Sequence, residues 1–153
     1  MNNKISKLQI KNIAWLITLA IFFLADRYLK SIAINSASKP LIKGLLDFNF
    51  IPNYKIAFSL PISGPWLIVL ISGVIAAICY YLFLNYKHLK TLEFISFFGI
   101  LLGATSNLID RFKYGFVVDY LDLKWFTIFN IADAMISICS LILLFSLLKK
   151  DSK

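Results

Sequence analysis

Four apolar stretches in the chain are each about as long as a helix that crosses a membrane. They lie at residues 13–33, 65–84, 92–109 and 129–148. A bilayer with a hydrocarbon core about 30 Å thick is crossed by about 20 mainly apolar residues in helical conformation. Apolar residues make up 59% of the 153-residue chain, more than a soluble domain of this size can bury. The sequence therefore predicts an all-α membrane protein with four transmembrane helices, organised as a single domain over residues 1–153.

The charge pattern also favours a membrane over a nucleic acid. The net charge is +8, but the basic residues flank the apolar stretches instead of forming one solvated face, which suits anionic lipid headgroups. Cys79, Cys139 and His88 are not spaced as metal ligands. We therefore expect no metal, no cofactor, no nucleic-acid partner and no obligate protein partner.

The first apolar stretch has two possible interpretations. Lysines precede it, as in a cleavable signal peptide. However, no cleavage site of the small-residue type follows, because the stretch continues into Asp26, Arg27 and Lys30. A retained helix is favoured, and a cleaved segment is the alternative.

Orientation is predicted from the density of basic residues near the ends of the stretches. Segments 1–12, 85–91 and 149–153 hold 8 basic residues in 24 positions, whereas segments 26–64 and 110–128 hold 8 in 58. This difference predicts that both termini are cytoplasmic and that the two longer loops are extracytoplasmic. Within the first of these loops, residues 46–50 alternate in polarity as a half-buried strand does. We expect a small extracytoplasmic β-structure between the first two helices, with backbone groups free to pair with an extended peptide.

Polar side chains at the extracytoplasmic ends of the stretches are the candidates for function, because such groups are costly to place in a membrane. They are Asp26 with Lys30, Asn53, Asn107 with Asp110 and Arg111, Asp119, and Asn130 with Asp133. Several have a structural interpretation. An ion pair between residues four apart, a turn-forming Asn and a salt bridge at a helix end each need no catalytic role. Asp133 could complement the dipole of the helix that it begins.

Asp119 and Asp133 stand out because no basic residue lies beside either in the sequence. If they meet, burial and mutual repulsion make the two carboxyl groups share one proton. The ionised group can then take a proton from water while the protonated group bonds to a scissile carbonyl. Asp110 is the rival partner for Asp133, but we expect the adjacent Arg111 to hold Asp110 in a salt bridge. The residues thus favour an intramembrane aspartyl hydrolase.

Five motifs in order make the chain resemble the lipoprotein signal peptidases, also called type II signal peptidases. The motifs are Asp26-Arg27-Tyr28-Leu29-Lys30, residues 53–58, Asn107-Leu108-Ile109-Asp110-Arg111, Val117-Val118-Asp119-Tyr120 and Phe129-Asn130-Ile131-Ala132-Asp133. The resemblance implies an endopeptidase of the bacterial inner membrane. It would remove the signal peptide from prolipoproteins, cutting before a diacylglyceryl-modified cysteine.

The resemblance also implies roles for individual residues. Asp119 and Asp133 would form the catalytic dyad. Asn53, Asn107, Arg111 and Asn130 would line or support the substrate site, and Asp26, Lys30 and Asp110 would hold the architecture around it. A small β-cradle beside the site is typical of the family. The chain departs from the family pattern at two positions, where Lys55 and Ser106 replace glycines.

Two other functions are compatible with four apolar helices. A channel or transporter subunit would need polar residues along the depth of several helices, whereas here they gather near one face. A hydrolase of phosphorylated lipids would need a basic cluster or metal-binding acids, and Arg111 with Lys113 is weak support for one.

Overall fold

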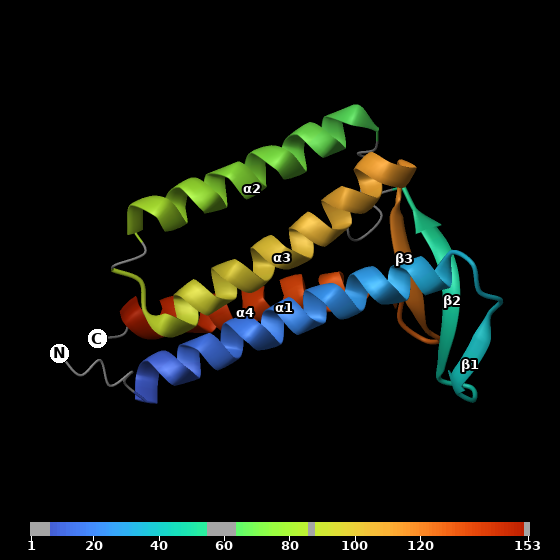
Figure 1. The fold of residues 1–153 in the computed structure, drawn as a ribbon, viewed down its shortest axis with the longest axis horizontal. Coiled ribbons are helices and arrows are strands. Elements are labelled where there is room, and N and C mark those ends of the chain that lie inside the picture. The colour runs from blue at the N-terminus through green and yellow to red at the C-terminus, as the bar shows by residue number, and fades with distance from the viewer. Residues whose placement is uncertain (1–6, 55–63, 86–87, 152–153) are drawn as a thin grey trace.

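The computed structural model of the protein describes residues 7–54, 64–85 and 88–151. Helices α1 (Lys7–Ala33), α2 (Pro65–Asn85), α3 (Thr91–Tyr114) and α4 (Ile131–Asp151) run alongside one another, and a small sheet lies across one end of the bundle (Figure 1). Each of the four helices contains a segment long and apolar enough to cross a membrane. The predicted fold class is confirmed.

Helix α3 is the central element, and it packs against α1, α2 and α4. Two glycines allow α4 to approach closely. A Cβ atom on Gly99 would lie 2.4 Å from the Cys139 sulfur, and one on Gly103 would lie 2.6 Å from the Ala132 carbonyl oxygen. The motif of small residues four apart therefore serves helix packing, as it does in other membrane proteins.

The outer surface of the bundle carries large apolar side chains. Ile21 and Leu24 on α1, Phe83 on α2 and Phe145 on α4 are all more than half exposed. Such a surface is unfavourable in water and favourable in lipid.

Helix α3 extends further than predicted. The expected span ended at residue 109, whereas the helix continues to Tyr114 and stops at Gly115, whose φ of 80° is left-handed. The Gly115 N–H donates to the Arg111 carbonyl at 3.0 Å, which is a standard glycine helix terminus. The apolar pattern ends early because Asp110 and Arg111 are buried within the last turns of the helix.

The sheet contains β1 (Lys39–Ile42), β2 (Leu46–Asn53), β3 (Val117–Leu123) and β4 (Ile128–Phe129), antiparallel and in that spatial order. The strand expected near residues 46–50 is present as part of β2. However, the sheet is not confined to the loop between the first two helices, because β3 and β4 come from the loop between α3 and α4. The expectation that this segment leaves its backbone N–H and C=O groups free for a peptide is also wrong. Strand β2 is an interior strand that pairs with both β1 and β3.

Strand β3 fixes the sheet to the helices. Val118 and Tyr120 are fully buried and pack with Ala33, the last residue of α1. The register of β2 on β3 places Ile51 opposite Asp119 and Asn53 opposite Val117. This pairing brings residues 46–53 beside residues 117–123, at the end of the bundle where the predicted polar residues gather.

Candidate active site

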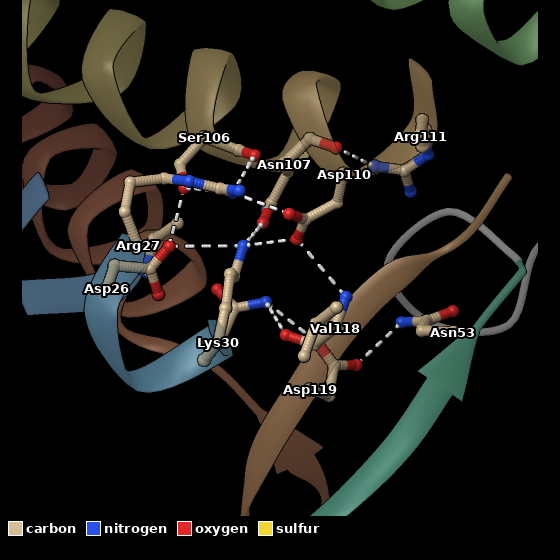
Figure 2. A network of polar contacts seen from close by, with 12 residues as sticks. Asp26, Arg27, Lys30, Asn53, Ser106, Asn107, Asp110, Arg111, Val118 and Asp119 are labelled. Atoms are coloured by element: carbon tan, nitrogen blue, oxygen red, sulfur yellow. Dashed lines mark hydrogen bonds and ion pairs between the residues drawn. The ribbon is translucent and has the colours of Figure 1, made fainter. Parts of the chain in front are cut away.

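A buried lysine organises the polar cluster at the sheet end of the bundle. The Lys30 ammonium group lies 3.1 Å from an Asp26 carboxylate oxygen, 2.7 Å from an Asp110 carboxylate oxygen and 2.7 Å from the Asn107 amide oxygen (Figure 2). An ammonium group has three hydrogens to donate, so these three acceptors use all of them. The predicted pair between Asp26 and Lys30 is confirmed. Because Lys30 is only 1% exposed, this complete set of partners is what makes its burial tolerable.

Asp26 connects several elements of the fold. Its Oδ2 accepts the Ser106 hydroxyl at 2.6 Å, and its Oδ1 accepts the Tyr120 hydroxyl at 3.0 Å and the Ala132 backbone N–H at 3.1 Å. Together with the Lys30 ammonium group, these donors come from four elements: α1, α3, β3 and α4. Asp26 is therefore a saturated carboxylate that holds four elements together.

Asp110 is likewise paired with cations. Its carboxylate forms ion pairs with Arg27 and Lys30 and accepts the Val118 backbone N–H at 3.2 Å. The expected salt bridge to the adjacent Arg111 is replaced by these two pairs from α1. Consecutive residues on a helix point about 100° apart, and Arg111 donates instead to the Asn107 carbonyl at 3.4 Å.

Asp119 lies in a different environment. Its Oδ1 accepts the Asn130 side-chain amide at 2.7 Å, and its Oδ2 accepts the Asn53 amide at 3.0 Å. It is only 3% exposed. Burial, followed by the nearby charge of Asp133, raises the pKa of Asp119 to about 7, although the two amide bonds and the charge of Lys30 act in the opposite direction.

Asp133 lies in the first turn of α4. Its Oδ1 accepts the Asn107 side-chain amide at 2.7 Å, and its Oδ2 accepts the Asn130 backbone N–H at 3.4 Å. In return, the Asp133 backbone N–H donates to the Asn130 side-chain oxygen at 2.8 Å. These reciprocal bonds form a capping box at the start of the helix, so the expected structural role at the helix N-terminus is also present.

Asn130 connects the two acids. Its side-chain oxygen accepts from Asp133 while its side-chain nitrogen donates to Asp119, and Asn130 is fully buried. The four buried or half-buried carboxyl groups of the cluster thus fall into two classes. Asp26 and Asp110 are paired with cations, whereas the contacts of Asp119 and Asp133 with other described residues are to amides. The second class can take up and release a proton without breaking an ion pair.

The structure brings every residue predicted for the site to the sheet end of the bundle, and it adds three. The predicted residues are Asp26, Lys30, Asn53, Asn107, Asp110, Arg111, Asp119, Asn130 and Asp133. Arg27, Ser106 and Tyr120 join the network although the sequence analysis assigned them no role. All three lie in or beside the quoted motifs, and Ser106 was visible only as a departure from the family pattern. Lys55 and the rest of the second motif lie outside the described residues.

The described part of the chain holds no group of three or more His, Cys, Asp or Glu side chains placed to bind a metal ion. The site contains two carboxyl groups, those of Asp119 and Asp133, that accept hydrogen bonds from side-chain amides.

Comparison with known proteins assigns the family. The family model described as signal peptidase (SPase) II matches residues 18–149. This chain belongs to the signal peptidase II family. Its similar relatives include the lipoprotein signal peptidase of Syntrophomonas wolfei, 38% identical over 76% of each chain. Another is the lipoprotein signal peptidase of Microcystis aeruginosa, 34% identical over 94% of this chain and 97% of the relative.

Solved structures support the fold of this signal peptidase II chain. A bacterial membrane enzyme determined by the in meso method at 2.3 Å resolution has a TM-score of 0.79, at 24% sequence identity. The match covers 93% of this chain and 90% of the other. A second such enzyme, at 1.9 Å resolution, has a TM-score of 0.74.

Proposed function

We propose that Asp119 and Asp133 form the catalytic dyad with which this signal peptidase II removes the signal peptide from prolipoproteins. Membership of the family makes the chain a multi-pass membrane protease that processes prolipoproteins. The observation that carries the assignment of the two aspartates is their set of partners. Both carboxylates receive hydrogen bonds from neutral amides. One buried side chain, that of Asn130, donates to the Asp119 carboxylate and accepts from the Asp133 backbone N–H.

The chemistry follows from one proton shared by two carboxyl groups. The ionised carboxylate takes a proton from water as the water oxygen attacks the scissile carbonyl carbon. The protonated carboxyl group donates its proton to the carbonyl oxygen, which gives a neutral tetrahedral intermediate. When the C–N bond breaks, the protonated carboxyl group gives its proton to the leaving nitrogen and the ionised carboxylate takes one from a hydroxyl of the intermediate, so the dyad again holds one proton. With a pKa of about 7, Asp119 is suited to hold the shared proton near neutral pH.

Asp110 is unsuited to this role. Its carboxylate is already held in ion pairs with Arg27 and Lys30 and accepts the Val118 backbone N–H, so the group serves the structure of the site.

Asn53 and Asn107 position the dyad, because each donates a side-chain N–H to one catalytic carboxylate. Asn130 fixes the position of Asp119 relative to Asp133. Arg111 donates to the Asn107 backbone carbonyl on the same helix. Asp26, Lys30 and Asp110 keep α1, α3, β3 and α4 in place around them.

The substrate is a prolipoprotein cut before a diacylglyceryl-modified cysteine in the bacterial inner membrane. The sheet end of the bundle is extracytoplasmic and both termini are cytoplasmic. This orientation agrees with the density of basic residues at the other end of the bundle. The chain works as a single domain that requires neither a cofactor nor a stable protein partner.

The test is cleavage of a diacylglyceryl-modified prolipoprotein by the purified protein in detergent or lipid. Asp119→Asn and Asp133→Asn are each expected to reduce the cleavage rate by at least about 1,000-fold, because each removes half of the acid–base pair. Asp122→Asn is the matched control. Asp122 lies on the same strand as Asp119, and the Asn49 amide is 3.5 Å from its carboxylate, so its loss leaves the rate near that of the unmodified protein.

Two results would refute the proposal. Near-normal cleavage by Asp119→Asn would exclude this residue from the dyad. Equal cleavage of a precursor that lacks the diacylglyceryl group would refute the lipid-dependent specificity.

A channel or transporter subunit is not favoured. Buried charged residues of the described chain gather at the sheet end, apart from Glu93 in the first turn of α3. No continuous polar path follows from this distribution.

A further inference from the structure

An apolar cavity of about 340 Å³ lies among α1, α3 and α4, outside the dyad. Its walls include Trp15 and Phe22 of α1, Ile95 of α3, and Met135 and Ile138 of α4. Trp15, Phe22 and Ile138 are each about half exposed, so the cavity reaches the lipid-facing surface of the bundle.

A second hollow, of about 380 Å³, adjoins the first at the end of the bundle opposite the sheet. The two share Leu92 and Ile142 in their walls. The charged side chains that line the second hollow are Lys90 and Lys149, both exposed. An apolar cavity thus continues into a basic one near the membrane surface.

An acid close to Lys90 is part of the start of α3. Glu93 is only 4% exposed. Its carboxylate accepts the Lys90 backbone N–H at 3.1 Å and lies 3.5 Å from the Ser146 hydroxyl, while the Lys90 ammonium group is 3.9 Å away. Glu93 is buried, so the exposed charged side chains among the described residues that line the hollow are the two lysines.

We infer that the two hollows together bind one anionic phospholipid, with an acyl chain in the apolar cavity and its phosphate between Lys90 and Lys149. The residues of α4 that line the cavity extend from Ile131 to Ile142, about 16 Å along the helix axis. This length is comparable to one leaflet of the hydrocarbon core, about 15 Å.

The walls favour an acyl chain over a peptide. Among the residues that line the apolar cavity, Thr18 and Ser96 carry hydroxyl groups, and the Thr18 hydroxyl already donates to the Ala14 carbonyl at 2.9 Å. An extended peptide would bury backbone N–H and C=O groups there without partners, which is costly in a membrane. An acyl chain has no such groups, and the two lysines select a negatively charged headgroup.

The experiment uses the fluorescence of Trp15. The double substitution Trp66→Phe and Trp125→Phe removes the other two tryptophans, which are at least 80% exposed. The protein is placed in nanodiscs of phosphatidylcholine that contain a small fraction of lipid with a brominated acyl chain, which quenches nearby tryptophan. Brominated phosphatidylglycerol is compared with brominated phosphatidylcholine at equal mole fraction.

At low mole fraction, the anionic brominated lipid is expected to quench Trp15 several-fold more efficiently than the neutral one. Lys90→Gln combined with Lys149→Gln should reduce this preference to about one, since each lysine near a membrane surface contributes about fivefold to anionic-lipid binding. Thr18→Phe should lower quenching by both lipids because the added ring fills the cavity. The control pair is Lys43→Gln with Lys113→Gln, two exposed lysines at the sheet end.

Equal quenching by the two brominated lipids would overturn the inference. An unchanged preference in the Lys90→Gln and Lys149→Gln variant would do so as well, because the headgroup would then bind elsewhere. Retained prolipoprotein cleavage by the same variant shows that it is folded, since neither lysine belongs to the dyad. The quenching result is therefore independent of the proposed catalytic mechanism.

Discussion

At the scale of single residues, the orientation of one amide group connects the structural charges to the dyad. The Asn107 oxygen accepts from Lys30, so its nitrogen must point the other way, toward Asp133. A similar argument fixes Asn130, whose oxygen is occupied by the Asp133 N–H. These amide orientations direct N–H donors at the carboxylates of Asp119 and Asp133, the proposed dyad.

The pKa of Asp119 predicts the pH dependence of cleavage. If Asp119 holds the shared proton with a pKa of about 7, kcat/KM falls as the pH rises above about 7. The Asn53 hydrogen bond lowers this pKa, so Asn53→Ala should move the alkaline limb to higher pH, by up to about one pH unit. The pH profile of kcat/KM tests this, with Asn49→Ala on the same strand as control. A limb that moves to lower pH in Asn53→Ala contradicts the prediction.

The effect of an Asp→Asn substitution on the free energy of unfolding should differ between the amide-bonded Asp119 and the cation-paired Asp110. The pKa of Asp119 is about 7 in the folded protein, against the ordinary 3.8 of an aspartate side chain. The folded protein therefore binds more protons between these values, and its stability decreases as the pH rises through that range, by up to about 4 kcal/mol. Asp119→Asn does not titrate there, so it should raise the thermal midpoint at pH 8 and lose this advantage near pH 4.

Asp110→Asn should have the opposite effect on stability. The substitution removes the negative charge from between Arg27 and Lys30, which costs about 3–5 kcal/mol for a buried pair. Thermal unfolding of both variants in detergent measures the contrast. If Asp110→Asn were as stable as the unmodified protein at pH 8, the structural role of Asp110 would be wrong.

The sequence identified the nine site residues better than it identified their partners. An Asp or Asn at the end of an apolar stretch is conspicuous because it is costly there. Ser106 and Tyr120 are not conspicuous, since both occur widely in apolar surroundings. Their roles depend on a single acceptor, Asp26, which is distant in the chain. Sequence spacing also misassigned the partner of Asp110, because the contacts come from another helix.

At the scale of secondary-structure elements, the close contact of α3 with α4 sets the position of Asp133. A Cβ atom on Gly103 would meet the Ala132 carbonyl oxygen at 2.6 Å and an Ile136 side-chain carbon at 2.8 Å. The backbone oxygen cannot rotate away, so Gly103→Ala should push apart the helices that carry Asn107 and Asp133. We expect a loss of about 1–3 kcal/mol in stability and at least about tenfold in cleavage rate.

Gly73→Ala provides the matched control for this substitution. Gly73 lies on α2, and a Cβ atom there would have no atom within 4 Å. Alanine favours the helix by about 0.5–1 kcal/mol, so this variant should be as stable as the unmodified protein or more so. Cleavage rate and thermal midpoint are measured for both variants, and equal behaviour would contradict the packing argument.

The helices were predictable from the sequence, whereas the sheet was only half predictable. Length and hydropathy locate a transmembrane helix without reference to the rest of the chain. One of the two partners of β2, however, is β3, whose residues lie about 70 positions further along the chain. The alternation at residues 46–50 indicated a strand but carried no information about which strand would pair with it.

At the scale of the whole molecule, the charge distribution predicts how the protein lies in the membrane. Lys43 lies in the turn between β1 and β2, and His88 lies between α2 and α3 at the other end. In a background of Cys79→Ala and Cys139→Ala, Lys43→Cys should react with a membrane-impermeant thiol reagent added to intact cells. His88→Cys should react only after permeabilisation, and the reverse pattern would contradict the proposed orientation.

The network around Asp26 also has a consequence for biosynthesis. Its donors come from α1, α3, β3 and the first turn of α4, so the bonds to this α1 residue are complete only after α4 has been synthesised and inserted. Asp119 and Asp133 follow later in the chain, and the Asn107 amide can reach Asp133 only when α4 has inserted beside α3. We therefore expect no cleavage by a nascent chain until α4 has inserted beside α3.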